Sequence, residues 1–276
     1  MANTLSGVLE IVTRTDPGMV RGHNEDAVFA NPSKGFAILA DGMGGYNAGE
    51  VASGMATMLL STELDTAFAH RPPYEIDRAS GQPFAHRCLQ DKVALANSAI
   101  YSAAETQPQY AGMGTTLVTA LFYDNRITVG HIGDSRVYRL RGEELTTITR
   151  DHSLLQEQID SGLISPEDAR YSQNKNLVTR ALGVDPEVET EIRDYEVQPG
   201  DIYLLCSDGL NDMVEDEEIQ LTLHTLAANL ELAATQLIQM ANDNGGRDNV
   251  SVILVKVLRE FPADRSWWSS LMAKIK

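Results

Sequence analysis

An apolar run that ends on one acid and a glycine-rich turn constrains this chain more than any other stretch. Residues 36–40 (Phe-Ala-Ile-Leu-Ala) lead directly into residues 41–45 (Asp-Gly-Met-Gly-Gly). A short apolar run bounded by turn residues is typical of a buried strand, and glycines let a ligand or a metal approach the backbone closely. The run therefore predicts a strand that carries a carboxylate to the edge of a sheet.

The same pattern recurs three times further along the chain. Residues 202–207 lead into Asp208, residues 129–133 lead into Asp134, and Asp248 directly precedes the strand-like residues 250–255. Four acids at the ends of four apolar strands would repel one another unless a cation lies between them. The spacing of these acids predicts a metal site.

Composition limits the class of protein. A chain of 276 residues with 43% hydrophobic residues is typical of one globular domain. Its 22 basic and 39 acidic residues give a formal net charge of −17, which disfavours nucleic acid and anionic membranes as general partners. No apolar run approaches the ~18 residues that span a bilayer, and the N-terminus lacks a basic-then-apolar signal pattern. We therefore expect a cytoplasmic protein that is not transmembrane.

Cysteine usage gives no sign of a disulfide framework or a zinc site. Cys88 and Cys206 do not repeat at a zinc spacing, and Cys206 falls in an expected core strand. We expect both thiols to be buried, reduced and inert.

Hydrophobic periodicity predicts a mixture of strands and helices. Three closely spaced strands after residue 115 indicate an antiparallel meander. A loop is expected at 66–87, with His70 and His86 in surface roles, and residues 150–183 are expected to form a flap over the edge of the site. The expected strands are 8–14, 27–30, 36–40, 116–123, 126–131, 135–140, 188–195, 202–206 and 250–258, and the expected helices are 48–64, 88–105, 153–161, 215–224 and 230–243.

A charged segment precedes the strand at 27–30. Its acids Glu25 and Asp26, with Arg21 nearby, suit a pocket that holds both the waters of a cation and an anion. A solvated loop is the alternative interpretation of this segment alone.

Six motifs occur in order along the chain. They are Arg21 with residues 24–26, residues 41–45, Gly114-Thr115-Thr116, residues 133–136, residues 207–210 and residues 246–249. This ordered set resembles the metal-dependent PP2C-type (PPM) serine/threonine protein phosphatases in their bacterial form. The resemblance covers roughly residues 8–258 and implies an α+β fold, a four-layer α-β-β-α sandwich with two antiparallel sheets flanked by helices. It implies one phosphatase domain at 1–260 and a short tail at 261–276.

The resemblance also implies roles for the acids in a centre of two Mn²⁺ or Mg²⁺ ions. Asp41 would bridge the ions, the Gly42 carbonyl would bind the first, and Asp208 and Asp248 would hold the second. Oxygen ligands suit these hard cations, which lie about 4 Å apart in two-metal hydrolases and activate a water for in-line attack. Asp134, together with Asp208, matches the position of a weaker third ion.

Other motif residues have implied roles around that centre. Glu25 and Asp26 resemble acids that orient the waters of the first ion. Arg21 resembles the residue that pairs with phosphate oxygens. Asn249 is either next to the ligands or a turn residue that hydrogen-bonds the backbone.

The general acid departs from the family pattern. Many relatives carry a histidine directly after the glycine turn, where this chain has Tyr46. A tyrosine with a pKa near 10 can donate a proton but matches neutral pH less well than histidine. His23 is the second candidate, with a solvent-exposed loop histidine as the alternative interpretation.

Several further motif residues have a structural interpretation. Arg136 is expected to be an ion-pair partner, and Thr115 and Thr116 are expected to pack and hydrogen-bond at the start of a strand. His131, in a strand, and His152, at a helix start, are expected to be structural.

Other hydrolase mechanisms are excluded by missing motifs. A cysteine phosphatase needs Cys-x5-Arg, but the sixth residue after Cys88 is Ala94 and the sixth after Cys206 is Asp212. The chain has no G-x-S-x-G elbow, no H-E-x-x-H helix and no P-loop. Two alternatives to a protein phosphatase stay open: a phosphoprotein-binding module with little turnover, and a phosphatase of small phosphate esters.

The expected partners are phosphorylated proteins, namely the substrates of a cognate bacterial Ser/Thr kinase. After Pro262, the apolar side chains of the tail fall on one helical face, with basic residues nearby. This pattern predicts docking to a partner or to a membrane surface, and folding back onto the domain is the alternative.

Overall fold

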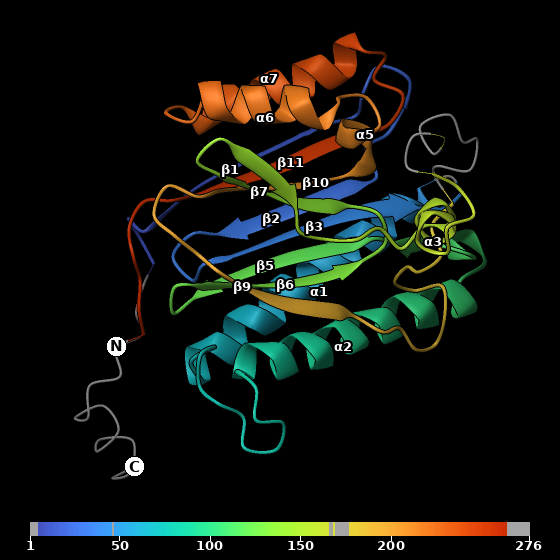
Figure 1. Cartoon of the computed structure of the whole chain (residues 1–276). Coiled ribbons are helices and arrows are strands. Elements are labelled where there is room, and N and C mark those ends of the chain that lie inside the picture. The colour runs from blue at the N-terminus through green and yellow to red at the C-terminus, as the bar shows by residue number, and fades with distance from the viewer. Residues whose placement is uncertain (1–4, 46, 166–167, 169–176, 264–276) are drawn as a thin grey trace.

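The structure is a computed structural model that describes residues 5–45, 47–165, 168 and 177–263. Two β-sheets form its centre (Figure 1), and every strand pairing is antiparallel. The first sheet has the order β1 (Leu9–Asp16), β11 (Val250–Val257), β10 (Ile202–Cys206), β7 (Arg136–Arg141), β8 (Glu144–Thr147). The second has the order β2 (Asp26–Asn31), β3 (Phe36–Met43), β5 (Leu117–Tyr123), β6 (Arg126–Ile132), β9 (Glu191–Glu196), with β4 (Gly114–Thr115) paired to β3.

Helices cover the outer face of each sheet. Helices α1 (Ala48–His70) and α2 (Phe84–Thr106) lie over the second sheet, and α6 (Asp216–Thr225) and α7 (Leu230–Asp243) lie over the first (Figure 1). The resulting four layers confirm the α-β-β-α sandwich expected from the sequence. The shorter helices are the 3₁₀ turn η1 (Pro108–Tyr110), α3 (Leu154–Asp160) and α5 (Asp208–Asn211).

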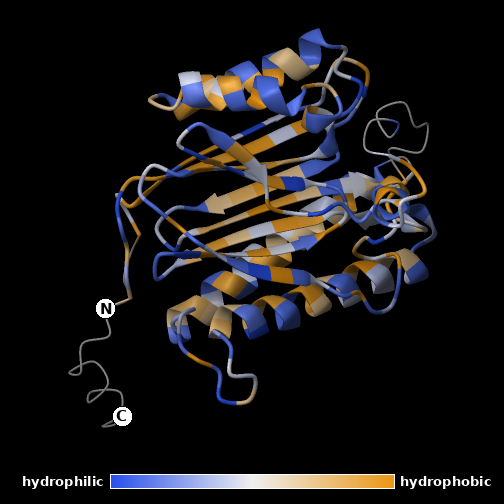
Figure 2. Ribbon diagram, viewed as in Figure 1, coloured by the Kyte–Doolittle hydropathy of each residue, from blue (hydrophilic) through white to orange (hydrophobic). Residues whose placement is uncertain are grey.

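Three apolar layers hold the sandwich together. One lies between α1, α2 and the second sheet, one between α6, α7 and the first sheet, and one between the sheets, where the rings of Phe122 and Tyr203 meet edge to face at 5.4 Å. Because strands such as β5 and β10 are buried on both faces, they are apolar at consecutive positions (Figure 2). This explains why the sequence pattern of these strands is a continuous apolar run.

The two long helices correct the loop expected at 66–87. Helix α1 continues to His70 and α2 begins at Phe84, so the connection spans only 71–83. The rings of Phe68 and Phe84 contact edge to face at 6.3 Å, and both side chains pack on the core under the helices. His86 therefore lies on α2, where its Nε2 atom is 2.8 Å from an Asp194 carboxylate oxygen.

The expected three-strand meander is also wrong. Strands β5 and β6 form a hairpin, but β7 crosses to the first sheet and pairs with β10 and β8. Gly133, at φ +100°, lies in the connection between β6 and β7, where the chain changes sheet. The short strand β8 had no signal in the sequence pattern.

Both cysteines are free and buried, as expected from the sequence. Burial raises the pKa of the Cys88 thiol to about 11 and that of Cys206 to about 12, so neither forms a reactive thiolate near neutral pH.

The C-terminal end of the described chain is fixed to the domain. Phe261 is buried in the core between the sheets, and its amide donates to Asn125 Oδ1 at 2.5 Å. The Ala263 amide donates to Asp124 Oδ1 at 2.8 Å. The tail residues 264–276, on which the docking prediction rests, lie outside the described residues. Within the part of the chain that is described, no helix is both long enough and apolar enough to cross a bilayer.

Candidate metal centre

The predicted acids gather at one end of the sandwich. Asp26, the first residue of β2, lies opposite Asp41 of β3. In the other sheet, Asp208 follows β10 and Asp248 precedes β11, and these antiparallel neighbours bring both acids to the same end. Asp134 lies in the connection between β6 and β7. Both sheets therefore contribute carboxylates to one centre.

The backbone of Asp41 is fixed by two threonines. The amide of Thr116 and the hydroxyl of Thr115 each donate to the Asp41 carbonyl at 2.8 Å. The Asp41 amide in turn donates to the Thr116 hydroxyl at 3.0 Å. The hydrogen-bonding role expected for both threonines is confirmed, and their effect is to hold Asp41 at the sheet edge.

Gly42 permits a close contact between β3 and the start of α1. Its amide donates to the Glu25 carbonyl at 3.0 Å. A Cβ atom at this position would lie 2.1 Å from the Gly49 carbonyl oxygen and 2.6 Å from that of Glu25. Only glycine lets these three backbone segments meet, and this contact brings Glu25 beside Asp41. The role of the Gly42 carbonyl as a ligand stays a prediction.

Asn249 connects the segments around the centre. Its Oδ1 atom accepts from the Glu25 amide at 2.7 Å, and its Nδ2 atom donates to the carbonyls of Pro17 and His23 at 3.0 and 2.9 Å. The Asn249 amide donates to Asp248 Oδ1 at 2.9 Å. These contacts favour the backbone-bonding interpretation of Asn249.

Ser207 is a residue of the centre that sequence reasoning missed. Its hydroxyl donates to Asp26 Oδ2 at 2.8 Å and accepts from the Ser251 amide at 3.0 Å. The contact joins an acid of the second sheet to the strand ends of the first. Its position directly before Asp208 was the one available signal.

The acids oppose one another's ionisation. Burial raises the pKa values of Asp41 and Asp208 well above the usual range, and neighbouring carboxylates add to the shift. Burial, with repulsion from Asp248, raises the pKa of Asp26 to about 6. Burial, with repulsion from Asp151, raises the pKa of Asp134 to about 6. A bound cation would reverse these shifts because it stabilises the charged carboxylates.

Three buried carboxylate oxygens have no hydrogen-bond partner among the residues that the structure describes: Glu25 Oε1, Asp26 Oδ1 and Asp208 Oδ1. Buried polar atoms are nearly always paired, so an unpaired group indicates a ligand. Carboxylate oxygens are the donors that Mg²⁺ and Mn²⁺ prefer. The residues present therefore fit a centre for these ions.

Arg21 lies next to the acids. Its Nη2 atom is 2.7 Å from Asp248 Oδ2, and the side chain is 51% exposed. The amides of Met19 and Val20 both donate to the Gly246 carbonyl, so the loop before Arg21 is fixed to the loop before Asp248. The hydrogen bond to Asp248 raises the pKa of Arg21, which keeps the guanidinium charged. Binding of phosphate by Arg21 stays a prediction.

Asp134 lies in a turn that is held by one ion pair and by hydrogen bonds. Arg136 contacts both carboxylate oxygens of Asp151, with Nη2 to Oδ2 at 2.7 Å and Nε to Oδ1 at 3.0 Å. The ion-pair role expected for Arg136 is thus confirmed. The Ser135 hydroxyl shares a hydrogen bond of 2.8 Å with that of Thr116, which connects this turn to Asp41.

Tyr46 and His23 are the two candidate general acids. Tyr46 lies outside the described residues. His23 is exposed, and its backbone carbonyl accepts the hydrogen bond from Asn249. The general acid stays a prediction for both residues.

The segment expected to form a flap is hydrogen-bonded to β4, whose Thr115 contacts Asp41. The described part of this segment contains α3. Near its end, the Leu182 amide donates to the Thr115 carbonyl at 2.8 Å, and the Thr115 amide donates to the Leu182 carbonyl at 3.0 Å. The Thr179 amide donates to the His152 carbonyl at 2.8 Å. Residues 166–167 and 169–176 of this segment lie outside the described residues.

A family model described as protein phosphatase 2C matches residues 21–254 of this chain. The curated serine/threonine protein phosphatase PstP of Mycobacterium tuberculosis is 42% identical over 251 residues, which are 91% of this chain and 45% of that protein. The chain thus spans about half the length of this relative. The serine/threonine phosphatase stp of Listeria monocytogenes is 40% identical over 246 residues, which are 88% of this chain and 94% of that protein.

A solved structure gives a similar result. The catalytic domain of PstP, in complex with two manganese ions, superposes with a TM-score of 0.79 at 41% identity, over 91% of this chain and 99% of that one. The family expected from the six motifs is confirmed by these comparisons.

Proposed function

Because the chain belongs to the protein phosphatase 2C family, we propose that it is a metal-dependent protein serine/threonine phosphatase. It hydrolyses phosphoserine and phosphothreonine in proteins. The observation that carries this proposal is the convergence of buried acids from both sheets, with carboxylate oxygens that have no hydrogen-bond partner among the described residues. The manganese ions in the related PstP structure support the same conclusion.

In this proposal, the acids hold two Mn²⁺ or Mg²⁺ ions. Asp41 would contact both ions, the Gly42 carbonyl would bind one, and Asp208 and Asp248 would bind the other, while Asp134 and Asp208 would hold a weaker third. When bound, the ions supply a nucleophilic water and positive charge against the phosphate oxygens. Glu25 and Asp26 orient the solvent around the ions. The side-chain oxygen of Asn249 accepts from the backbone amide of Glu25 and so fixes that residue.

Arg21 binds the phosphate in this proposal. Its guanidinium is half-exposed beside Asp248, so one edge stays available for two phosphate oxygens. The charge on phosphate is greatest in the transition state, where a fixed cation contributes most to the rate. Tyr46 or His23 donates the proton to the leaving serine or threonine oxygen.

The substrates in this proposal are cytoplasmic phosphoproteins made by a cognate Ser/Thr kinase in a bacterium. The net charge of −17 favours substrates other than nucleic acid. Residues 1–260 form the phosphatase domain, with residues 150–183 as a flap that helps to select substrates. Phe261 is held in the core, so the part of the expected tail that docks a partner begins after Ala263.

The test is hydrolysis of a phosphothreonine peptide by metal-stripped protein, with and without added Mn²⁺ or Mg²⁺. We expect turnover only with the metal. Asp208→Asn removes a ligand charge and should lower kcat by on the order of 100-fold or more at equal metal concentration. Asp91→Asn, at an exposed position on α2, is the matched control and should leave turnover unchanged.

The outcomes separate the alternatives. Turnover of p-nitrophenyl phosphate without turnover of phosphopeptides would favour a small phosphate ester as the substrate. Binding of the phosphopeptide without hydrolysis of either compound, in folded and metal-loaded protein, would favour a binding module.

A further inference from the structure

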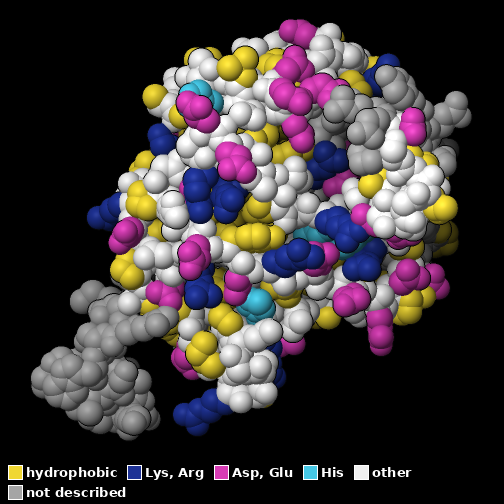
Figure 3. All heavy atoms as spheres, viewed as in Figure 1, with side chains coloured by type: hydrophobic (Ala, Val, Ile, Leu, Met, Phe, Trp, Pro, Cys, Tyr) yellow, Lys and Arg dark blue, Asp and Glu magenta, His cyan; other side chains and the backbone are white. Residues whose placement is uncertain are grey.

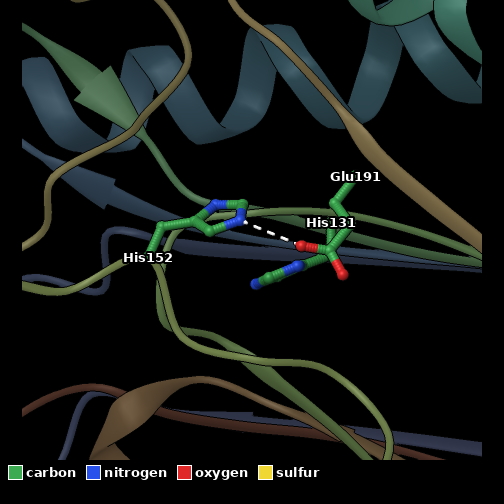
Figure 4. A group of neighbouring side chains, drawn as sticks. All are labelled: His131, His152 and Glu191. Carbon is green, nitrogen blue, oxygen red and sulfur yellow. Dashed lines mark ion pairs between the residues drawn. The ribbon is translucent and has the colours of Figure 1, made fainter. Parts of the chain in front are cut away.

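His131, His152 and Glu191 form a compact polar group (Figure 4), and His131 precedes Asp134 by three residues. Among the residues that the structure describes, they are the one group of three or more His, Cys, Asp or Glu whose ligand atoms all lie within 4.8 Å of one another. His131 of β6 lies directly opposite Glu191 of β9 in the register. His152 stacks on His131, with ring centroids 4.3 Å apart. Such a group could either hold a metal ion or fix the backbone beside it.

The hydrogen bonds of Gly133 decide which nitrogen of each ring carries the hydrogen. The Gly133 carbonyl can only accept, so His131, at 3.0 Å, must donate to it from Nε2. The Gly133 amide can only donate, so His152 must accept at Nδ1, at 3.2 Å. Burial lowers the pKa of His131 to about 4, so this ring is neutral at pH 7, and burial also lowers the pKa of His152. A His152 ring that accepts at Nδ1 must itself be neutral, because an imidazolium has no acceptor nitrogen. A neutral His152 that accepts at Nδ1 carries its hydrogen on Nε2.

This tautomer speaks against a metal site. The Nε2 atom of His152 faces Glu191 Oε2 at 3.5 Å, which is longer than an ordinary hydrogen bond. A metal held by His152 and Glu191 would need the lone pair at Nε2, and the ring would then carry its hydrogen on Nδ1, directed at the Gly133 N–H. The Nδ1 lone pair of His152 is used by the Gly133 amide and its Nε2 carries a hydrogen, so this ring offers no lone pair to a cation held with Glu191. The two histidines instead form a polar brace around Gly133.

The brace holds both the backbone N–H and the backbone C=O of Gly133. Its carbonyl also accepts from the His152 amide at 2.8 Å, so one residue contacts Gly133 from its backbone and from its ring. Gly133 has φ +100°, and a Cβ atom there would lie 2.7 Å from the Thr116 side chain. Any other residue would therefore be strained at this position, and the next residue is Asp134.

We propose that His152, with His131, is a positioning residue that fixes the peptide of Gly133 and thereby directs the Asp134 carboxylate toward the acidic centre. This inference rests on the proposed function because it takes Asp134 as a cation ligand. Neighbouring contacts support it: Asp151 holds Arg136 and His152 holds Gly133, so two consecutive residues grip the turn on both sides of Asp134.

Two substitutions at His152 separate the two ring nitrogens. The Oδ1 atom of asparagine lies near the position of Nδ1, so His152→Asn keeps an acceptor for the Gly133 amide. The amide group of glutamine lies near Nε2, so His152→Gln loses that acceptor but keeps a polar group facing Glu191. The brace predicts that Asn is the better replacement, whereas a metal or ion-pair role of Nε2 predicts that Gln is.

The readout is Mn²⁺ binding to the full chain, measured by calorimetry and by the electron paramagnetic resonance signal of free Mn²⁺. Asp134→Asn defines the component of binding that depends on Asp134. We expect His152→Gln to weaken that component roughly tenfold, as loss of one hydrogen bond predicts, and His152→Asn to weaken it at most about twofold. Glu191→Gln should leave it within about twofold of the wild type.

The reverse order of the two His152 variants, or a large effect of Glu191→Gln, would overturn the proposal. If Asp134→Asn binds Mn²⁺ like the wild type, the third ion of the proposed function is wrong and this inference fails with it. If Asp134→Asn weakens Mn²⁺ binding but neither His152 variant does, the proposed third ion stands and only the inference about His152 fails. Should His152→Gln not fold, ¹⁵N NMR of the wild type decides: hydrogen on Nε2 of both rings supports the brace, and hydrogen on Nδ1 of His152 refutes it.

Discussion

At the scale of single residues, Arg21 shows how a side chain can be both paired and available. It donates to Asp248, yet half of its side chain is exposed. A planar guanidinium that uses one edge for a carboxylate keeps its other donors for a phosphate. A lysine has the same charge but lacks this fork.

Arg21→Lys should therefore lower kcat/KM for p-nitrophenyl phosphate by on the order of 100-fold, because paired donors to the developing phosphate charge are lost. Steady-state kinetics at saturating Mn²⁺ is the measurement. Arg14→Lys is the matched control, since Arg14 pairs with Glu231 at an exposed site. Equal, small effects in both variants would mean that Arg21 only pairs with Asp248.

Residues that follow one another in the chain were the ones that sequence reasoning placed best. Asp41, Asp208 and Asp248 were predicted because each adjoins an apolar strand, and the sheets bring these strand ends together. Ser207 and His152 gained their roles from contacts with Asp26 and Gly133, which lie 181 and 19 residues away. No local pattern marks such partners, because the fold alone makes them neighbours.

At the scale of elements, the contact of β3 with the start of α1 determines the geometry of the centre. Contacts between elements also explain two errors of the prediction from sequence. Helix ends were misplaced because Phe68 and Phe84 extend the helices by packing on each other, and β7 was misassigned because a positive φ at Gly133 let the chain change sheet. Tertiary contacts override local periodicity in both cases.

Gly42→Ala tests the contact of β3 with α1. Its Cβ would meet the Gly49 carbonyl at 2.1 Å, so the helix must shift, at a cost of about 1–3 kcal/mol in the free energy of unfolding. Urea unfolding of metal-free protein measures this directly. Gly54→Ala, within α1 and with no atom within 4 Å of its Cβ, should instead stabilise by up to about 1 kcal/mol. Similar stabilities for the two variants would contradict the close contact.

At the scale of the whole molecule, charge is distributed unevenly. The net charge is −17, and on the face shown in Figure 3 acidic side chains are prominent over α6 and α7. Inside, acids are concentrated at one end of the sandwich, where burial, together with repulsion between neighbouring carboxylates, raises the pKa values of Asp41 and Asp208. Stability should therefore depend on both pH and cations.

The pH dependence should include a clear contribution from His131. Its pKa is lowered from 6.5 to about 4 in the folded protein, so below pH 6.5 the unfolded chain binds a proton that the folded chain does not. This contribution to stability is present above pH 6.5 and is lost as the pH falls toward 4. The stability lost by pH 5 amounts to about 2 kcal/mol. In urea unfolding, His131→Gln should lose less stability than the wild type between pH 7 and pH 5, by about that amount. An unchanged loss of stability would show that His131 is not buried in its neutral form.

The acids of the centre come from different layers, with Asp41 on the second sheet and Asp208 and Asp248 on the first. An ion that binds them joins the two halves of the sandwich, and its binding energy then adds to the free energy that keeps the halves together. Local opening at this end would become rarer as free Mn²⁺ rises, and so would cleavage by a protease. The lifetime of such a protein in a cell would then follow the supply of its metal.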